Sequence, residues 1–102
     1  MTSGYVLTET AQGELGELLH YVATNSGASR ALEVHGRFVS AFEHLAVLPS
    51  AGSRRPNLTS DRIRWWKVYQ WCVIYDPDPK PLVVLRVVHT RRLLSRLLQS
   101  EH

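Results

Sequence analysis

The chain has 102 residues, 44% of them hydrophobic and 21% charged, and these values are ordinary for a folded globular domain, which excludes disordered, collagen-like and coiled-coil classes. The length allows one domain over residues 1–102, with a single core. No apolar stretch approaches the ~20 residues of a membrane span, and the N-terminus lacks the pattern of a signal peptide. We therefore expect a cytoplasmic protein with no membrane partner.

The positive charge is concentrated in the second half of the chain. Residues 1–53 hold two Lys or Arg against five Glu, a net charge of −3, and residues 54–102 hold ten against four acidic residues, a net charge of +6, which together give the +3 of the whole chain. Such asymmetry favours a polyanion or an acidic protein as the partner of the second half. A basic surface that is simply solvated is the alternative.

The first half is predicted to form a short strand and two helices. The apolar run at residues 5–7 indicates the strand, and Thr8 has the side chain of a helix N-cap. Helical spacing of apolar residues predicts one helix over about residues 9–24 and a second from about Ser29 to the stop at Pro49. Because a turn of about four residues, 24–27, joins them, the helices should form an antiparallel hairpin that packs on a sheet.

The second half is predicted to form three strands. After a long loop at residues 49–61, strands are expected at 63–68, 71–75 and 82–88, with turns at 69–70 and in the proline-rich segment 76–81. A short C-terminal helix should follow over about residues 91–99. The fold class is thus α+β, in the order β-α-α-β-β-β with a short final helix, and the sheet is mostly antiparallel with about four strands.

Strand alternation assigns side chains to the two faces of this sheet. In the last strand Val83, Leu85, Val87 and His89 share one face, which the helices should cover, and Arg86 points to the other, where a partner can reach it. Trp65 and Trp66 must also point to opposite faces.

No metal or cofactor site is expected. The histidines lack the spacing of zinc ligands, glycine-rich phosphate loops are missing, and the single cysteine, Cys72, lies in a strand-like run typical of a small buried residue. What remains is a set of cations around the strands: Arg54, Arg55, Arg62, Arg64, Lys67, Arg86, Arg91 and Arg92, together with His89.

These residues permit one catalytic interpretation. Cleavage of RNA by its own 2′-hydroxyl needs a base, an acid and cations around the phosphate. His89 has the chemistry of the base or acid, and Arg64, Arg86 and Arg91 have that of the cations. The set lacks a clear second member of the acid–base pair, so this assignment is chemically permitted and not specific. Binding of a partner by the cations and by one exposed tryptophan is the alternative.

The whole pattern resembles the RelE/ParE superfamily of toxins from bacterial type II toxin–antitoxin systems. The resemblance rests on YVLT followed by Ala11, the start of the second helix near Ala31, LAVLPSAG with Gly52 before a basic loop, the RWWKVY and VIY strands, and the ending LRVVHTRRL. His89-Thr90-Arg91-Arg92 in that ending is similar to the ParE-like branch.

The resemblance implies a toxin that arrests growth when it is released from a cognate antitoxin, whose acidic C-terminal segment covers the basic surface. ParE-like members inhibit DNA gyrase, and RelE-like members cut mRNA on the ribosome. The ParE-like function is favoured because no tyrosine follows position 75, whereas His89, Arg64 and Arg86 leave the nuclease open; a non-toxic interaction module is a third alternative. Residues expected to contact the target or antitoxin are Arg54, Arg55, Arg62, Lys67, Trp66, Arg91 and Arg92.

Overall fold

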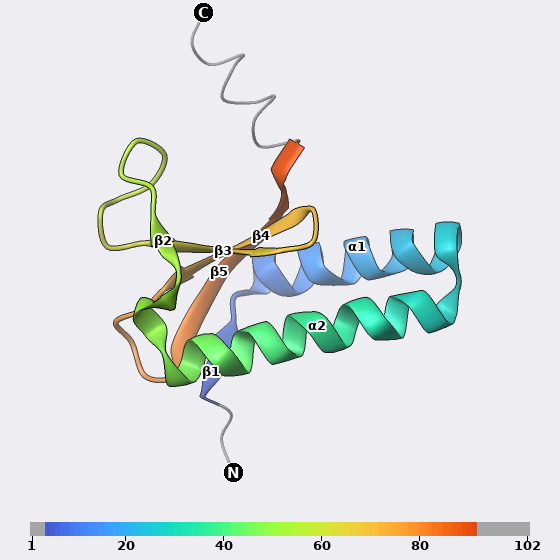
Figure 1. Ribbon diagram of the computed structural model, residues 1–102, viewed down its shortest axis with the longest axis horizontal. Helices are drawn as coiled ribbons and strands as arrows, with labels where there is room; N and C mark the ends of the chain where they lie inside the picture. The colour runs from blue at the N-terminus through green and yellow to red at the C-terminus, as the bar shows by residue number, and fades with distance from the viewer. Residues whose placement is uncertain (1–3, 92–102) are drawn as a thin grey trace, which may run out of the picture.

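Two helices pack against one face of a five-stranded sheet in the computed structural model, which describes residues 4–91 (Figure 1). The elements in chain order are β1 Tyr5–Leu7, α1 Glu9–Ser26, α2 Ala28–Val47, the 3-10 helix η1 Pro49–Ala51, β2 Ser53–Arg54, β3 Arg64–Val68, β4 Trp71–Asp76 and β5 Leu82–His89. This confirms the α+β class and the order of the elements. The fifth strand is β2, which lies within the predicted loop at residues 49–61. The predicted C-terminal helix lies outside the described residues from position 92 onward.

Helix α1 begins after an N-cap side chain, that of Thr8, and ends at a glycine, Gly27. The Thr8 hydroxyl accepts a hydrogen bond from the Ala11 amide at 3.0 Å, as expected of an N-cap, and donates one to the Leu85 carbonyl at 2.8 Å. At the other end Gly27 has φ 92 and ψ 163, a region that is essentially restricted to glycine. The two helices are therefore joined by this single residue, instead of the four-residue turn that was predicted.

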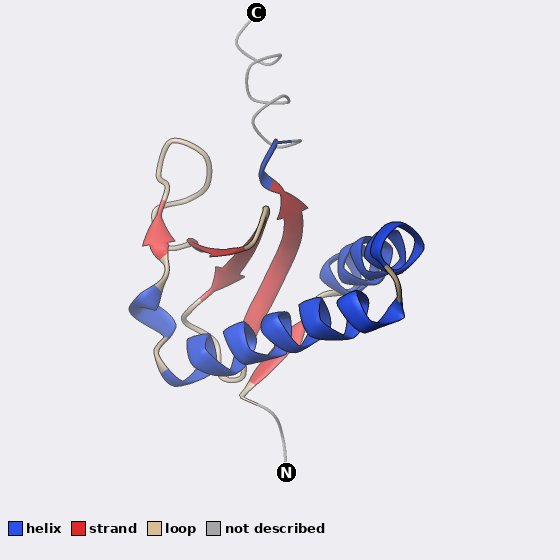
Figure 2. Cartoon of the chain, turned by 45° about the vertical axis from the view of Figure 1, so that its right-hand side comes forward, coloured by secondary structure: helices blue, strands red, loops and turns tan. Residues whose placement is uncertain are grey.

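Helix α2 carries the larger apolar stripe and ends before Pro49, as predicted. Its buried residues recur at helical spacing: Val34, Phe38, Ala41, Phe42 and Leu45. Figure 2 shows the two helices lying side by side on the same side of the strands. They cover that face, and no helix of residues 4–91 covers the opposite face of the sheet.

The sheet has the order β1-β5-β4-β3-β2. Strand β1 pairs with β5 in parallel, with Tyr5 opposite Leu82, and the other neighbours are antiparallel. The β3–β4 hairpin has Val68 opposite Trp71, so that the turn contains two residues. The last strand of the described residues, β5, thus lies between β1 and β4.

A β-bulge changes the alternation of side chains in β5. Ile74 lies opposite Arg86 and its neighbour Tyr75 lies opposite Val84, so Leu85 is the extra residue. Before the bulge Leu82 and Val84 face the helices; after it Val87 takes that face, with His89 beside Trp71. The prediction that Val83 and Leu85 share the helix-covered face was therefore wrong, because strict alternation takes no account of an inserted residue.

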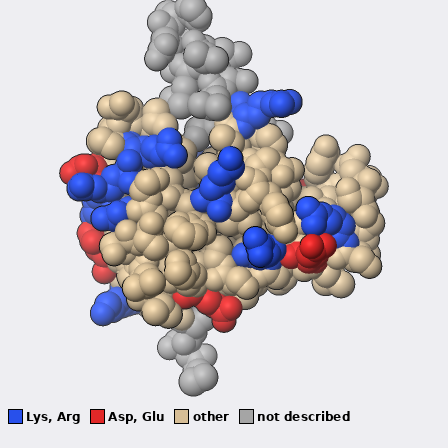
Figure 3. Space-filling model, viewed as in Figure 1, with Lys and Arg blue, Asp and Glu red and all other residues tan. Residues whose placement is uncertain are grey.

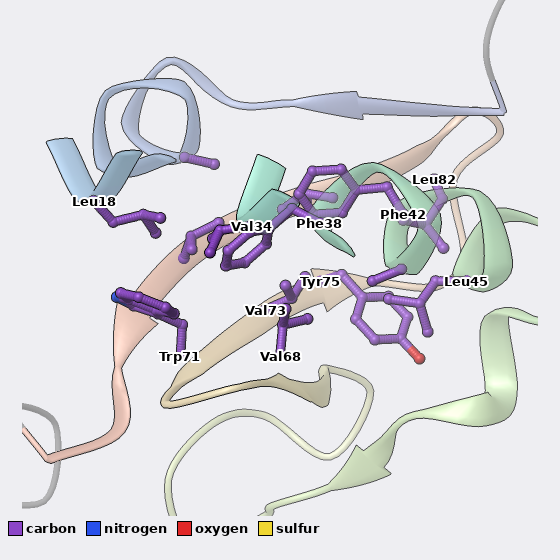
Figure 4. Packing of buried hydrophobic residues seen from close by; sticks show 14 of the residues in the cluster. Leu18, Val34, Phe38, Phe42, Leu45, Val68, Trp71, Val73, Tyr75 and Leu82 are labelled. Carbon is purple, nitrogen blue, oxygen red and sulfur yellow. The ribbon is translucent and has the colours of Figure 1, made fainter. Parts of the chain in front are cut away.

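Apolar residues are buried on both faces of the sheet. The main cluster joins the helices to Val68, Trp71, Val73, Tyr75, Leu82, Val84 and Val87 (Figure 4). A smaller cluster on the opposite face contains Ile63, Trp65, Cys72 and Ile74. Trp65 and Trp66 belong to different clusters, which confirms their predicted opposite orientation. Within residues 4–91, no helix is both long enough and apolar enough to cross a membrane.

Candidate functional site

The predicted cations occupy several separate places on the molecule. Figure 3 shows Lys and Arg in distinct patches on one face, some of them next to acidic residues. In the loop region Arg54 pairs with Asp61 at 3.6 Å, and Arg62 pairs with Asp76 at 3.0 Å and Asp78 at 3.6 Å. Much of the positive charge that the sequence places before β3 is thus compensated within the chain.

Arg64 supports the connection between α2 and β3. Its Nη1 donates to the Ser50 carbonyl at 3.2 Å and to the Gly52 carbonyl at 2.7 Å. The neighbouring Tyr75 hydroxyl donates to the Pro49 carbonyl at 2.7 Å and accepts from the Gly52 amide at 2.9 Å. Burial raises the pKa of Tyr75, an effect that the Gly52 hydrogen bond and the Arg64 charge partly oppose. Arg64 therefore binds backbone carbonyls around a neutral phenol.

Arg86 is exposed, as expected, but a carboxylate from α1 holds it in place. Its Nη2 lies 2.6 Å from Glu14 Oε2, and its Nε lies 3.0 Å from both carboxylate oxygens. Glu14 also accepts from the Val87 amide at 2.9 Å. Hydrogen bonding to Glu14 raises the pKa of Arg86, against partial burial, which lowers it. Sequence reasoning missed Glu14, because nothing in a helix sequence indicates which strand its carboxylate will reach.

His89 packs edge-on against the Trp71 ring, with 6.0 Å between the ring centroids. Its Nδ1 accepts from the Arg91 amide at 3.2 Å. Such an acceptor needs a lone pair on Nδ1, which leaves the proton of the neutral ring on Nε2. The His89 side chain therefore accepts a backbone hydrogen bond at the end of β5, where the chain leaves the sheet.

The structure does not bring Arg64, Arg86 and His89 together. Arg64 lies opposite Tyr75, whereas His89 lies opposite Trp71, which separates them by about 13 Å along the strands and by about 9 Å across β4. Arg86 contributes to a hollow on the face away from the helices. No single phosphate can contact all three side chains in this arrangement.

Both tryptophans of β3 have neighbours within the chain. The Trp65 indole donates to the Thr59 hydroxyl at 3.0 Å and lies under the Arg55 guanidinium, 5.8 Å from the ring centroid. Trp66 is half-buried and its ring lies 5.2 Å from that of His44. Of the two, Trp66 keeps the more accessible surface. Lys67, the next residue, is exposed.

A shallow hollow of about 410 Å³ opens on the face of the sheet away from the helices. Its lining is Leu58, Thr59, Ser60, Ile63, Trp65, Ile74, Leu85 and Arg86. The lining is largely apolar, with the guanidinium of Arg86 as its one charged member. Among residues 4–91, His, Cys, Asp and Glu side chains form no group suited to hold a metal ion.

A further cluster at the β3–β4 turn escaped the sequence analysis. The guanidiniums of two α2 arginines lie over the Tyr69 ring, Arg30 at 5.0 Å and Arg37 at 5.6 Å from its centroid. The available signal was a tyrosine at a two-residue turn, a position that usually holds glycine or asparagine. The two arginines were not predictable, because they come from a helix more than thirty positions earlier in the chain.

Comparison with known proteins identifies the family and the fold. The family model described as the ParE toxin of the type II toxin–antitoxin system parDE matches residues 5–94. The chain belongs to the ParE toxin family. This ParE-family chain has no match among curated proteins. It is similar to a solved chain from the chromosomal ParDE toxin–antitoxin system of P. aeruginosa, with 17% identity and a TM-score of 0.71, over 83% of this chain and 92% of that one.

The structural likeness to the P. aeruginosa chain is a likeness of fold, since the identity is low. Membership of the ParE family confirms the superfamily resemblance and the ParE-like branch that the ending of the sequence indicated.

Proposed function

We propose that this ParE-family chain arrests growth in the cytoplasm by inhibiting DNA gyrase when it is free of a cognate antitoxin. The observation that carries the proposal is the family match over residues 5–94. Inhibition by binding needs a stable surface, and it does not need an acid–base pair at one phosphate.

The arrangement of the cations supports binding over catalysis. Arg64 donates to two backbone carbonyls and Arg86 to Glu14, so each already has acceptors within the chain. His89 lies on a different part of the sheet from Arg64. An mRNA endonuclease built on these three residues would need all of them to move, and a binding protein would need no such change.

The antitoxin is proposed to present an acidic segment to the basic half of the chain. Residues 54–102 carry a net charge of +6, and complementary charge speeds association and selects the partner. Described residues proposed to contact the antitoxin or the target are Arg54, Arg55, Arg62, Lys67, Trp66 and Arg91. Arg92 has the same proposed role and lies outside the described residues.

The test combines purified gyrase with a transcript assay. We expect the purified toxin to inhibit gyrase-driven supercoiling, and an equimolar amount of its antitoxin to restore it. Induced cells should filament and show a DNA-damage response, with intact messages at translated codons. Cleaved transcripts at those codons, with normal supercoiling activity, would instead establish the ribosome-dependent endonuclease.

A further inference from the structure

The β3–β4 turn holds a bulky residue in a conformation that side chains rarely adopt. Tyr69 has φ 54, and among residues 4–91 it is the one non-glycine residue with a positive φ. The left-handed region is unfavourable for a residue with a side chain, because its Cβ lies too close to the following carbonyl oxygen. Strained backbone of this kind occurs preferentially at functional sites. A tyrosine therefore needs a reason to replace the glycine or asparagine that the turn would favour.

The tyrosine ring organises two cations of α2. Arg30 and Arg37 are spaced by two helical turns and both guanidiniums lie against the ring, 5.0 and 5.6 Å from its centroid. A guanidinium that stacks on an aromatic ring keeps its N–H donors in its own plane. Arg30 uses one of them on Glu33 at 3.1 Å. Arg37 has no ion pair with a carboxylate in the described part of the chain.

Two further cations lie near the same turn. Lys67 precedes Tyr69 by two residues and is exposed. The Thr90 amide donates to the Gln70 carbonyl at 2.9 Å, which brings the exposed Arg91 close to the turn. Within residues 4–91, neither Lys67 nor Arg91 has a carboxylate partner. This end of the sheet thus differs from the loop end, where Arg54 and Arg62 are paired with aspartates.

We propose that Tyr69, Arg30 and Arg37 form a contact site for an acidic segment of the target protein. The inference rests on the proposed function, because it takes the toxin to act by binding a protein. Tyrosine and arginine are the residue types that most often dominate the energy of protein interfaces. The guanidiniums that lie against the ring of Tyr69 also leave it poorly available for stacking on a nucleic-acid base, which favours a protein carboxylate as the ligand.

Three variants of the full-length toxin test the site. Tyr69→Asn removes the ring and keeps a residue that accepts a positive φ, and Arg37→Gln removes a cation without a carboxylate partner. Lys80→Gln is the matched control, since it removes one exposed charge in the β4–β5 connection. Melting temperature checks the fold, and growth arrest, inhibition of supercoiling and binding to purified gyrase subunits check the function.

We expect Tyr69→Asn and Arg37→Gln each to weaken gyrase binding and inhibition by about tenfold or more, as hot-spot residues do, with melting temperatures within a few degrees of the wild type. Lys80→Gln should behave as the wild type. Arg37→Lys should restore only part of the loss, because an ammonium lacks the planar fork of a guanidinium.

The outcomes separate the two proposals. If both variants arrest growth and inhibit gyrase as the wild type does, the contact site is wrong and gyrase inhibition stands. If wild-type toxin leaves gyrase unaffected while the variants still lose growth arrest, the contact site stands and gyrase is the wrong target. A toxin that binds DNA alone, with the same losses in Arg37→Gln, would overturn the assignment to an acidic protein.

Discussion

Glu14 of α1 and Arg86 of β5 are 72 positions apart in the chain, and their side chains form a bidentate pair with 2.6 Å between Oε2 and Nη2. The same carboxylate accepts from the Val87 amide. Strand β1 pairs with β5 only as far as Val84, so beyond that point α1 supplies the acceptor at the edge of β5. A helix side chain there takes the place of a neighbouring strand.

Glu14→Ala should lower the free energy of unfolding by about 1–2 kcal/mol. The pair is partly exposed, with 44% of the Arg86 side chain accessible, so its ionic part is modest, and the unpaired Val87 amide adds to the loss. Urea unfolding measures the change. Glu17→Ala, an exposed site on the same helix, is the control and should shift stability by less than about 0.5 kcal/mol. Equal stability of the two variants would contradict the role of Glu14.

Gly52→Ala should destabilise the fold by about 2–3 kcal/mol. A Cβ at this position would lie 2.5 Å from the Tyr75 hydroxyl and 2.8 Å from the Trp65 carbonyl oxygen, and forced overpacking of this kind typically costs 1–3 kcal/mol. Gly36→Ala in α2 is the matched substitution, because nothing lies within 4 Å of its Cβ position. It should raise stability by about 0.5–1 kcal/mol through helix propensity. Thermal unfolding of both variants measures the contrast.

Tyr75 should make stability fall at alkaline pH. Burial raises its pKa in the folded state above the ordinary value of 10.0, so the folded protein holds the phenolic proton more tightly than the unfolded chain does. That contribution is complete below about pH 10 and is lost as the pH rises through the folded-state pKa. Tyr75→Phe should lose about 1–2 kcal/mol at neutral pH, with its two hydrogen bonds, and show a shallower alkaline decline. Parallel curves for the two proteins from pH 8 to 11 would rule out this linkage.

His89→Gln should leave growth arrest and gyrase inhibition intact. Glutamine keeps an acceptor at the end of β5 and cannot act as an acid or base near neutral pH. The comparison needs equal levels of soluble protein, since loss of the contact with Trp71 has a small cost in stability. Loss of arrest together with loss of mRNA cleavage would establish the nuclease in place of gyrase inhibition.

Substitution of both Arg91 and Arg92 by alanine should weaken growth arrest. Arg91 is exposed directly after the final strand, and both residues are proposed to bind the target or the antitoxin. Titrated expression with a growth readout measures the loss. If the double alanine variant arrests growth fully at the same level of soluble protein, Arg91 and Arg92 do not belong to the proposed binding surface.

Local signals in the sequence predicted most of the fold. The cap at Thr8, the stop at Pro49 and the two-residue turn at Tyr69 each depend on neighbouring residues only, and each appears in the structure. The β-bulge at Leu85 was not predictable, since one strand does not reveal the register of its partner. Short strand β2 was missed for a similar reason, because two exposed residues give no periodicity.

The candidate site was harder to predict than the fold. Composition identified the cations, and the family ending identified the class of toxin. Which carboxylate, carbonyl or ring each arginine meets depends on long-range packing: Arg86 meets Glu14, Arg64 meets Gly52, and Arg37 meets Tyr69. The charge pattern of the sequence therefore predicted one basic surface, whereas the folded chain holds these arginines in several separate contacts.

The pairing of β1 with β5 joins the beginning of the described chain to its final strand. Residues 5–7 are synthesised early, and their strand hydrogen bonds form only after residues 82–84 have been synthesised. Pairing between residues so distant in sequence slows folding, because the entropy of closing the intervening loop is lost before the contacts form. A chain terminated before residue 82 lacks the strand that joins the start of the molecule to the rest of its sheet, and we expect such fragments to be unstable.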